Sequence, residues 1–253
     1  MAKNYFSGAA KYYDVILGRK KYEQYAKFVS KLLKKFNVRS VLELGCGTGL
    51  YLVSLQKKGF DVEGLDISDE MLRELRKKTK NIRLYKQDMA QFKLNKKYDA
   101  ILILNSSLIL LSRWSQVVRT LEKVRIHLHK KGILIIDLPN HAIEMKESKV
   151  QERKTYKLAN GRLNVVFRDY KKANKWVSEC MGSVREGNAR SEFKEYYEEL
   201  LYSPAKLEKI LKQKGFRIMR VFGSRGGGAF DRNKSYRRFY LCQKTEKKKE
   251  SNH

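Results

Sequence analysis

The 253-residue chain carries 56 Lys and Arg against 27 Asp and Glu, which gives a formal net charge of +29 at pH 7. Apolar residues make up 42% of the chain and only two residues are proline, so a wholly disordered protein and long proline-rich linkers are excluded. No apolar run approaches the roughly 20 residues of a membrane span, and the first residues contain no apolar segment followed by a cleavage site. We therefore expect a cytoplasmic protein that does not enter a membrane.

The three cysteines give no metal or disulfide signal. Cys46, Cys180 and Cys242 form neither a CxxC pair nor a regular framework. We expect no metal site and reduced thiols, with Cys46 acting as a small spacer inside its loop.

The positive charge is spread along the chain but is heaviest at its end. Residues 204–253 carry a net charge of +11, whereas residues 144–203 carry only +3. An excess of this size favours nucleic acid or another polyanion as a partner, because neutralising phosphates releases counterions. A lysine-rich solvated surface, of the kind common in proteins from hot environments, explains the same composition. Charge alone leaves RNA as an alternative partner.

Strand and helix patterns alternate between residues 20 and 143. The expected strands are residues 39–44, 61–68, 81–88, 98–105 and 132–138. The expected helices are residues 20–36, 50–60 (ending at Gly59), 69–78 (capped by Ser68) and 113–130. Continuous apolar runs such as AILIL and ILII are typical of strands covered on both faces. Repeated strand and helix units predict an α/β fold with a doubly wound, Rossmann-like, mostly parallel seven-stranded sheet.

The pattern changes after residue 143, where we expect an antiparallel β insertion after the fifth strand. The Asn160-Gly161 pair separates two alternating segments, which is a hairpin signal, and residues 175–184 and 191–202 are further strand candidates. The core pattern then resumes with a helix opened by Ser203 and Pro204. Two last strands, residues 217–223 and 236–244, are expected to pair antiparallel across a glycine-rich turn.

Three glycines follow the first strand at every second position, in the stretch VLELGCGTG. Ligands of open α/β sheets bind beyond the carboxyl ends of the strands, where the strand order reverses, and glycine lets the backbone approach a ligand closely. The GxGxG spacing of Gly45, Gly47 and Gly49 differs from the GxGxxG of dinucleotide sites. A tight turn without a ligand is the alternative explanation.

Acidic residues end the next two strands. Asp66 lies 21 residues after Gly45, where a carboxylate can accept hydrogen bonds from ribose hydroxyls, and Asp88 ends the third strand. Together with Glu43 they would repel a phosphate, so we expect an uncharged or cationic nucleoside. The alternatives are a helix cap for Asp66 and a turn acid for Asp88.

These segments resemble the class I S-adenosylmethionine-dependent methyltransferases over nearly the whole chain. ELGCGTG is similar to the glycine motif of that family, GLDIS to its second acidic motif, KQDM to its adenine-side motif and YDAILILN to its fourth strand. The resemblance implies S-adenosylmethionine as the cofactor. It also implies a methionine end shaped by Glu43, Gly45, Gly47 and Gly49, ribose hydroxyls bound by Asp66, adenine packed on Ile67, and an amino edge met by Asp88 and the backbone of Met89.

Two further residues follow from the same resemblance. Asn105, at the end of the fourth strand, would face the methionine portion or the substrate, and Tyr13 would be a lid residue over the cofactor. A strand-end cap and a packed tyrosine are the respective alternatives.

The acceptor is weakly encoded, because the sulfonium of the donor is itself the electrophile. The stretch NSSL stands where nucleic-acid adenine methyltransferases have an Asn/Asp-Pro-Pro-aromatic motif, and no cysteine matches the cytosine carbon-5 motifs. The pattern is most similar to the small-molecule branch of the glycine N-methyltransferase type, which implies methyl transfer to a small-molecule acceptor by direct in-line displacement. The alternatives are an RNA or protein methyltransferase that uses its basic surface, and a non-catalytic cofactor-binding regulatory protein.

Three residues are substrate candidates by position. Asn140 and His141 follow the fifth strand, and Arg225 lies in the glycine-rich turn, where it would meet an acidic group or be a solvated loop arginine. The aromatic residues of the insertion are expected to pack on a strand face or to line a pocket; they are Tyr156, Phe167, Tyr170, Trp176, Phe193, Tyr196 and Tyr197. The oligomeric state and the use of a general base are not predicted.

The chain is expected to divide into five parts. They are an N-terminal helical lid (residues 1–36), a cofactor-binding Rossmann-like core (37–143), an antiparallel insertion that covers the substrate (144–203), the completion of the core sheet (204–243) and a disordered basic tail (244–253).

Overall fold

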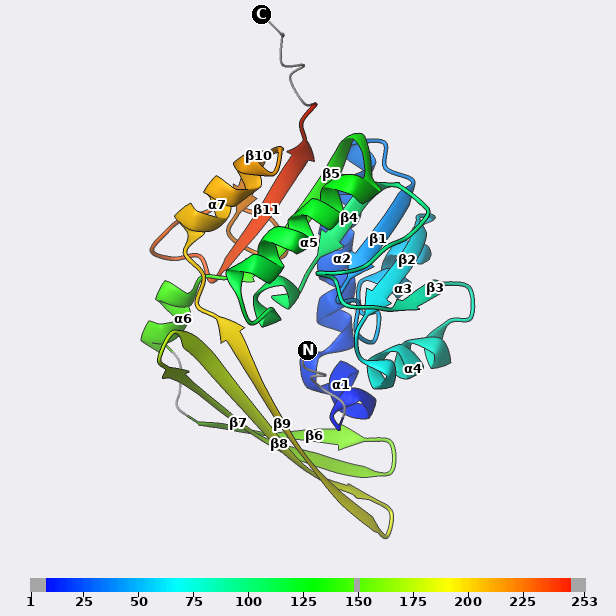
Figure 1. The fold of residues 1–253 in the computed structure, drawn as a ribbon. Coiled ribbons are helices and arrows are strands. Elements are labelled where there is room, and N and C mark those ends of the chain that lie inside the picture. The colour runs from blue at the N-terminus through cyan, green and yellow to red at the C-terminus, as the bar shows by residue number, and fades with distance from the viewer. Residues whose placement is uncertain (1–7, 148–150, 247–253) are drawn as a thin grey trace, which may run out of the picture.

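Two β-sheets organise the chain in the computed structural model, which describes residues 8–147 and 151–246 (Figure 1). The core sheet has seven strands: β1 (Ser40–Leu44), β2 (Asp61–Asp66), β3 (Arg83–Lys86), β4 (Tyr98–Ile103), β5 (Leu128–Pro139), β10 (Phe216–Phe222) and β11 (Arg237–Lys244). The second sheet has four: β6 (Glu152–Leu158), β7 (Gly161–Lys172), β8 (Lys175–Glu186) and β9 (Ala189–Leu200). Of the predicted tail, residues 247–253 lie outside the described residues.

Helices connect and cover these strands. The α-helices are α1 (Tyr13–Leu17), α2 (Arg19–Lys35), α3 (Leu52–Gln56), α4 (Asp69–Lys78), α5 (Trp114–His127), α6 (His141–Glu147) and α7 (Pro204–Gln213). Two short 3-10 helices, η1 (Ala10–Tyr12) and η2 (Ser107–Leu110), precede α1 and follow β4.

The core sheet has the strand order β10-β11-β5-β4-β1-β2-β3, and only β11 runs antiparallel to its neighbours. The chain runs outward from β1 to β3 and then returns to the other side of β1 with β4. This reversal places the carboxyl ends of β1 and β4 side by side, which is where ligands bind in open α/β sheets. The predicted doubly wound, mostly parallel seven-stranded sheet is confirmed.

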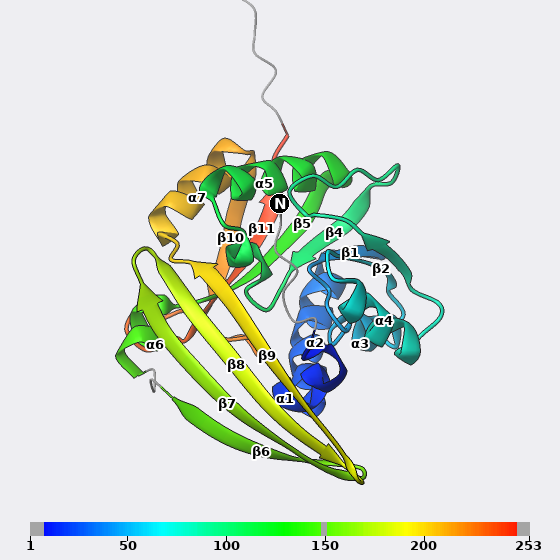
Figure 2. The same cartoon turned by 60° about the horizontal axis from the view of Figure 1, so that its bottom comes forward.

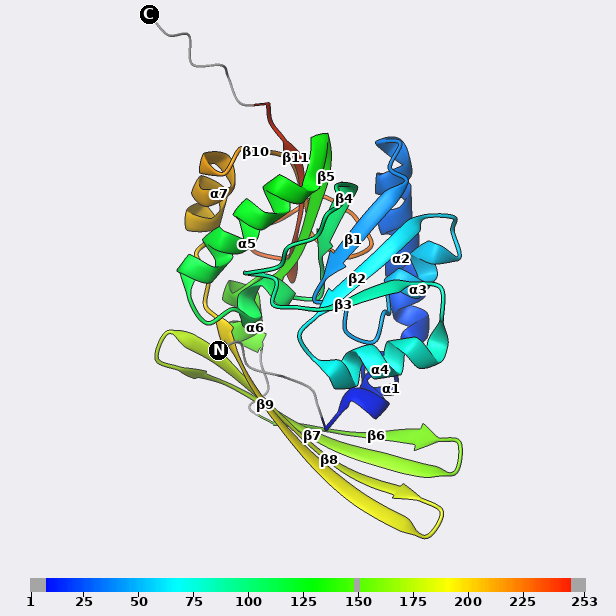
Figure 3. The ribbon, with the colours of Figure 1, turned by 45° about the vertical axis from the view of Figure 1, so that its right-hand side comes forward.

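Helices cover both faces of the core sheet (Figures 1 and 3). On β1, Leu42 and Leu44 belong to the buried cluster that includes residues of α5 and α7, whereas Val41 belongs to the cluster that includes residues of α2, α3 and α4. Since both faces are covered, the central strands carry continuous apolar runs, such as AILI in β4 and ILII in β5, instead of strict alternation.

Local capping signals set two helix starts where the sequence places them. The Ser68 hydroxyl accepts a hydrogen bond from the Met71 amide at 3.3 Å at the start of α4. The Ser203 hydroxyl does the same for Lys206 at the start of α7, whose first residue is Pro204. Each cap satisfies an amide that has no partner within the helix.

The helix predicted over residues 113–130 is too long, because α5 ends at His127 and β5 begins at Leu128. Leu128 is extended, fully buried and paired with Tyr98 of β4. Because of this strand pairing and burial, the helix ends three residues earlier than the apolar spacing indicates. Likewise α3 is shorter than the predicted helix over residues 50–60, and α1 and α6 were not predicted.

The predicted antiparallel insertion is confirmed as the sheet β6-β7-β8-β9, with the Asn160-Gly161 pair at the β6–β7 turn. This sheet lies across the molecule next to α1 (Figure 2). The segment before α1 is fastened to it, since the amides of Gly8 and Ala9 both donate to the Glu195 carboxylate and the Tyr12 ring stacks on Phe193. The described residues before α2, from Gly8 on, are thereby held between the insertion sheet and the core.

A buried carboxylate ties the first half of the core sheet together. Glu63 on β2 is 5% exposed and accepts hydrogen bonds from the hydroxyls of Tyr98 (2.6 Å) and Tyr85 (2.8 Å) and from the Lys96 ammonium (2.7 Å). Burial alone would raise the pKa of Glu63, but these hydrogen bonds hold it below its ordinary value. The charged form of Glu63 therefore stabilises the contacts among β2, β3 and β4.

We expect Glu63→Gln to lower the free energy of unfolding by about 1.5–3 kcal/mol at pH 7, because an amide cannot accept from all three donors. A carboxyl whose folded-state pKa is depressed contributes stability above its ordinary pKa, near 4.5, and that stability is lost as the pH falls through the folded-state pKa. The difference between wild type and variant should shrink on going from pH 6 to pH 3, as measured by urea unfolding.

Glu74→Gln is the matched control. Glu74, whose side chain is 21% exposed, pairs with the exposed Lys77 within α4, so its substitution should change stability by at most about 1 kcal/mol. A pH-independent effect of Glu63→Gln would contradict the stabilising role of the Glu63 charge.

Candidate functional site

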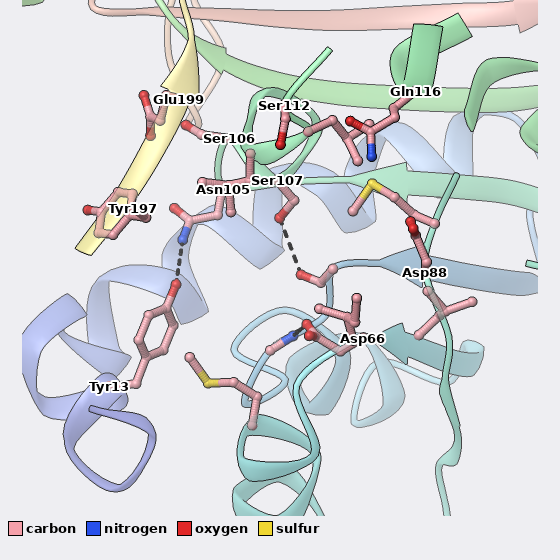
Figure 4. Close-up of a pocket in the computed structure, with 18 of the residues that line it drawn as sticks. Tyr13, Asp66, Asp88, Asn105, Ser106, Ser107, Ser112, Gln116, Tyr197 and Glu199 are labelled. Atoms are coloured by element: carbon pink, nitrogen blue, oxygen red, sulfur yellow. Dashed lines mark hydrogen bonds between the residues drawn. The ribbon is translucent and has the colours of Figure 1, made fainter. Parts of the chain in front are cut away.

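A cavity of about 300 Å³ lies at the carboxyl ends of the core strands, where the strand order reverses (Figure 4). Loops after β1, β2, β3 and β4 form one side of it, and Tyr197 and Glu199 of β9 stand on the other. The volume falls in the range of small-molecule pockets, which starts near 300 Å³. The core sheet and the insertion sheet therefore enclose this cavity together.

Eight of the ten predicted cofactor residues line the cavity. They are Tyr13, Gly45, Gly47, Asp66, Ile67, Asp88, Met89 and Asn105. Glu43 and Gly49 do not line it. The structure thus brings together residues from four separate loops, although their individual roles toward a ligand stay predictions.

The Asp66 carboxylate fastens the glycine loop. One oxygen accepts from the Gly47 amide at 2.7 Å and the other accepts from the Ser68 amide at 2.9 Å. Burial raises the pKa of Asp66, although these amides act in the opposite direction. The Ile67 amide is a third donor to this carboxylate. Because a carboxylate can accept about four hydrogen bonds, Asp66 can accept one more from a donor in the cavity.

Asp88 combines two of its predicted roles. Its carboxylate accepts from the Ala90 amide at 2.8 Å and from the Gln91 side chain at 3.3 Å, as a turn acid does. The residue also lines the cavity. The local turn and the position in the cavity are therefore compatible.

Gly49 and Glu43 lie outside the lining for different reasons. A Cβ on Gly49, whose φ is +77°, would come within 2.3 Å of Leu75 on α4. Gly49 is therefore required for packing. Glu43 on β1 is 3% exposed, and its Oε2 has no hydrogen-bond partner among the described residues. Burial, followed by the nearby charge of Asp66, raises the pKa of Glu43 well above its ordinary value.

Asn105 is the centre of a hydrogen-bond network at the end of β4. Its amide nitrogen donates to the Tyr13 hydroxyl at 3.0 Å (Figure 4), and its amide oxygen accepts from Tyr22 at 2.7 Å and from Arg225 at 2.8 Å. Asn105 and Ser106 both have positive φ angles, of 52° and 67°. The chain therefore turns sharply here, and Tyr13 is held over the cavity by a side chain of the core sheet.

Asp137, at the end of β5, anchors this network. It is fully buried and pairs with Arg225 Nε at 2.6 Å and Arg237 Nε at 2.9 Å. Burial would raise the pKa of Asp137, but the two guanidinium groups hold it below its ordinary value. The Asp137 carboxylate also accepts a hydrogen bond from the backbone amide of Asn105 at 3.1 Å.

Arg225 is thus not a solvated loop arginine. Its side chain is 16% exposed and its acidic partner is Asp137 of the same chain. The sequence analysis missed both Asp137 and Arg237. The available signal was the acid inside the apolar run ILIIDL, because a buried carboxylate requires a cationic partner.

The other two substrate candidates, Asn140 and His141, do not belong to the lining of this cavity. The Asn140 side chain donates to the carbonyl oxygens of Arg232 (3.1 Å) and Ser235 (2.8 Å), which fixes the loop before β11. His141 is buried, and its Nε2 lies 3.3 Å from the Glu199 carboxylate. Asn140 and His141 therefore contact segments that carry lining residues.

A second cavity, of about 460 Å³, adjoins the first. The two share four lining residues, Ser106, Tyr197, Glu199 and Arg237. Tyr197 was one of the insertion aromatics, whereas the sequence analysis did not single out Ser106 or Glu199. Ser106 directly follows the predicted Asn105, whereas Glu199 has no local signal in the sequence because it reaches the site through long-range packing.

Residues 8–147 and 151–246 contain neither a candidate metal centre nor a candidate membrane-spanning helix. No group of three or more His, Cys, Asp or Glu side chains in this part of the chain is arranged to hold a metal ion. The three cysteines are buried and free. In the same residues, no helix has the length and apolar character needed to cross a membrane.

Comparison with known proteins gives consistent matches. Residues 41–132 match a family described as a methyltransferase domain. The chain is 27% identical over 222 residues to YqeM of Bacillus subtilis (strain 168), which has a provisional methyltransferase name; the match covers 85% of this chain and 88% of that protein. It is 30% identical over 129 residues to the dTDP-3-amino-3,4,6-trideoxy-alpha-D-glucopyranose N,N-dimethyltransferase of Streptomyces venezuelae, a match that spans 49% of this chain and 54% of that protein.

A solved structure shares the fold over nearly the full length. The S-adenosylmethionine-dependent methyltransferase from Clostridium acetobutylicum ATCC 824 superposes with a TM-score of 0.81, at 22% identity, over 95% of this chain and 99% of that one. Residues 41–132 thus match a methyltransferase domain, and the chain has the fold of S-adenosylmethionine-dependent methyltransferases. Together these findings indicate a methyltransferase that uses S-adenosylmethionine as its methyl donor.

The first cavity fits this donor chemically. A Cβ on Gly47 would meet no atom within 4 Å, so the glycine loop leaves open space beside its backbone. Asp66 offers carboxylate lone pairs, while Ile67 and Met89 offer apolar surface. Carboxylates at the ends of β2 and β3 also suit a ligand with a cationic sulfonium and no phosphate.

Two glycine substitutions should separate binding from packing. Gly47→Ala places a methyl group in the cavity, so we expect about a tenfold loss of S-adenosylmethionine affinity, or about 1.4 kcal/mol, by calorimetric titration. Gly49→Ala places a methyl group against Leu75, so we expect a loss of about 2–4 kcal/mol in the free energy of unfolding.

The two variants control for each other, since both glycines have positive φ angles. The free energy of unfolding of Gly47→Ala should fall by only about 1–2 kcal/mol, which is the cost of the strained backbone. Weaker donor binding by a fully stable Gly49→Ala would show that this glycine contacts the ligand after all.

Proposed function

We propose that the enzyme transfers a methyl group from S-adenosylmethionine to an amine nitrogen of a small molecule. The observation that carries this proposal is the pair of adjoining cavities, one at the carboxyl ends of the core strands and one under the insertion sheet. Such an arrangement offers separate space for a donor and for a small acceptor. The similarity to an N,N-dimethyltransferase that acts on an amino sugar supports nitrogen as the accepting atom.

The reaction requires orientation more than chemical activation. S-adenosylmethionine supplies a methyl group on a sulfonium; the acceptor forms the new bond to that carbon while the carbon–sulfur electron pair stays on sulfur. The residues around the cavities must hold the acceptor in line and keep water out. Orientation of this kind can contribute about 7–11 kcal/mol to lowering a barrier.

The predicted residue roles belong to the same proposal. Asp66 binds the ribose hydroxyls, Ile67 packs on the adenine, and Asp88 with the Met89 backbone meets the adenine amino edge. Their shared position in the lining supports these roles. Tyr13, tied to Asn105, acts as the lid residue at the side of the cavity away from Asp88.

The proposed domain roles follow from the same arrangement. Residues 1–36 serve as the lid and residues 144–203 as the substrate cover. The contacts of Gly8, Ala9 and Tyr12 with the insertion sheet support a joint action of these two parts.

Asp66→Asn tests the donor side. An amide presents a donor to either the Gly47 or the Ser68 amide and loses the charged acceptor, so we expect S-adenosylmethionine affinity to fall about 10-fold to 100-fold. Calorimetric titration of the purified variant measures this, with circular dichroism to confirm that it is folded.

Asp69→Asn is the matched control, because Asp69 is an exposed acid at the start of α4, three residues later. Its donor affinity should stay within about twofold of wild type, as for other exposed charges. Equal donor affinity in wild type and Asp66→Asn would remove Asp66 from the donor site.

Methyl transfer itself is tested with radiolabelled S-adenosylmethionine and three acceptor sets, namely small amines, total tRNA and an unfolded protein mixture. We expect label in the small amines, and its loss in Asp66→Asn. Label in tRNA or protein alone would support the alternative in which the basic surface binds a macromolecular acceptor. Tight donor binding with no transfer to any set would contradict the proposed reaction.

A further inference from the structure

The second cavity concentrates negative charge in a strongly basic protein. Four of its eleven lining residues are acidic, whereas the whole chain has 27 acidic residues in 253. The four are Glu144, Glu152, Asp169 and Glu199. They come from α6, β6, β7 and β9, so the cluster is a product of the fold and not of a run of acidic sequence.

The strand register of the insertion sheet brings three of these acids onto one face. Asp169 pairs with Ser178, which pairs with Tyr197, and Glu199 is two residues further along β9. Glu152 pairs with Phe167, which is two residues before Asp169 on β7. Because paired residues and residues two apart share a face, all three carboxylates lie on the side of the sheet that faces the core.

Two of the acids have no Lys or Arg partner in the ion pairs of the described residues. Asp169 accepts a hydrogen bond from the Ser178 hydroxyl, and Glu199 contacts only His141 among groups that can carry positive charge. The cationic lining residue, Arg237, is already paired with Asp137 and lies 3.8 Å from Glu144. Negative charge in the cavity is therefore in excess.

This excess is unfavourable for the protein alone. Burial raises the pKa of Asp169, and the like charges of Glu199 and Glu152 raise it further. His141, which is 7% exposed, lies against Glu199 and Trp176, and its Nδ1 has no hydrogen-bond partner in the described part of the chain. A bound cation would relieve the repulsion among the carboxylates and use their remaining lone pairs.

Glu199 connects the two cavities. It lines both of them and stands beside Tyr197 on the side of the first cavity away from Asp66 (Figure 4). An amine held at Glu199 would thus lie at the boundary with the space assigned to the methyl donor. Asp169, which lines only the second cavity, is left for another positive group of the same molecule.

We propose that the second cavity selects an acceptor that carries at least two amino groups and no phosphate. The reacting amine lies at Glu199, where it gives up its proton to solvent before its lone pair attacks the methyl carbon, and a second amine is held as an ammonium group at Asp169. This inference rests on the proposed function and narrows its substrate class. A nucleotide-linked amino sugar, such as the substrate in the name of the Streptomyces venezuelae relative, carries phosphates that these carboxylates would repel.

A matched pair of probes tests the charge selection. The full-length enzyme, saturated with S-adenosylhomocysteine, is titrated calorimetrically with 1,4-diaminobutane and with 4-aminobutanoate, which has the same chain length but a carboxylate in place of one amine. We expect the diamine to bind about tenfold or more tightly than the amino acid at equal ionic strength.

Variants then locate the binding. Glu199→Gln and Asp169→Asn should each weaken diamine binding about tenfold, since each removes a charged acceptor. Glu192→Gln is the control, because Glu192 is an exposed acid on the other face of β9 and should leave diamine affinity unchanged. Retained S-adenosylhomocysteine affinity shows that a variant is folded.

Each remaining outcome is decisive. Equal affinity for the two probes, or no diamine binding by the S-adenosylhomocysteine complex, overturns the inference and leaves the proposed function standing. Diamine binding that survives both Glu199→Gln and Asp169→Asn overturns it as well. Failure to bind S-adenosylhomocysteine overturns the proposed function, and this inference with it.

Discussion

The buried Asp137 carboxylate is the contact on which the rest of the site depends. It lies at the end of β5 and joins Arg225 from the loop after β10, Arg237 from the start of β11, and the Asn105 amide after β4. Removing a carboxylate from water costs several kcal/mol unless cations and hydrogen bonds replace the water. Here two guanidinium groups and an amide do so, and three separate chain segments are held at one point.

This anchoring explains why the chain can turn sharply after β4. Asn105 and Ser106 both adopt positive φ angles, which costs of order 1–3 kcal/mol for each residue that is not glycine. Asp137 holds the turn through the Asn105 amide and through its own backbone carbonyl, which accepts from the Ser106 amide at 3.0 Å. The turn presents the Asn105 side chain to Tyr13 and Tyr22. The ion pairs of Asp137 on β5 therefore help to position the helices that carry these two tyrosines.

Local patterns predicted the parts of the site that depend on neighbouring residues in sequence. The glycine spacing, Asp66 and Asp88 stand at the ends of consecutive strands, so the periodicity of the fold places them together, as the lining confirms. Gly49 follows the same spacing, yet its neighbour is Leu75 of α4, which spacing cannot reveal. The same limit applies to α5, whose apolar spacing continues beyond His127 although pairing with Tyr98 already fixes Leu128 in a strand.

The Asp137 network and the second cavity could not be predicted in this way, because their residues meet only through tertiary structure. Arg225 meets Asp137 across 88 residues of sequence, and His141 meets Glu199 across 58. In the sequence alone, none of these residues shows which partner it meets. Asp137 shows only that it needs a partner, since a carboxylate between apolar residues of a covered strand requires one.

The overall charge of the protein conceals the charge of its cavities. A net charge of +29 favours polyanions at the surface, but at physiological salt its influence fades over about 8 Å, whereas a ligand inside a cavity interacts first with the groups that line it. Those groups include Asp66 and Asp88 around the first cavity and four acids around the second. Glu199 belongs to both linings, so under the proposed function an acceptor held in the second cavity lies beside a carboxylate where the two cavities meet. The basic composition of the chain and the acidic lining of the second cavity therefore favour different partners, and the proposed methyl transfer depends on the lining.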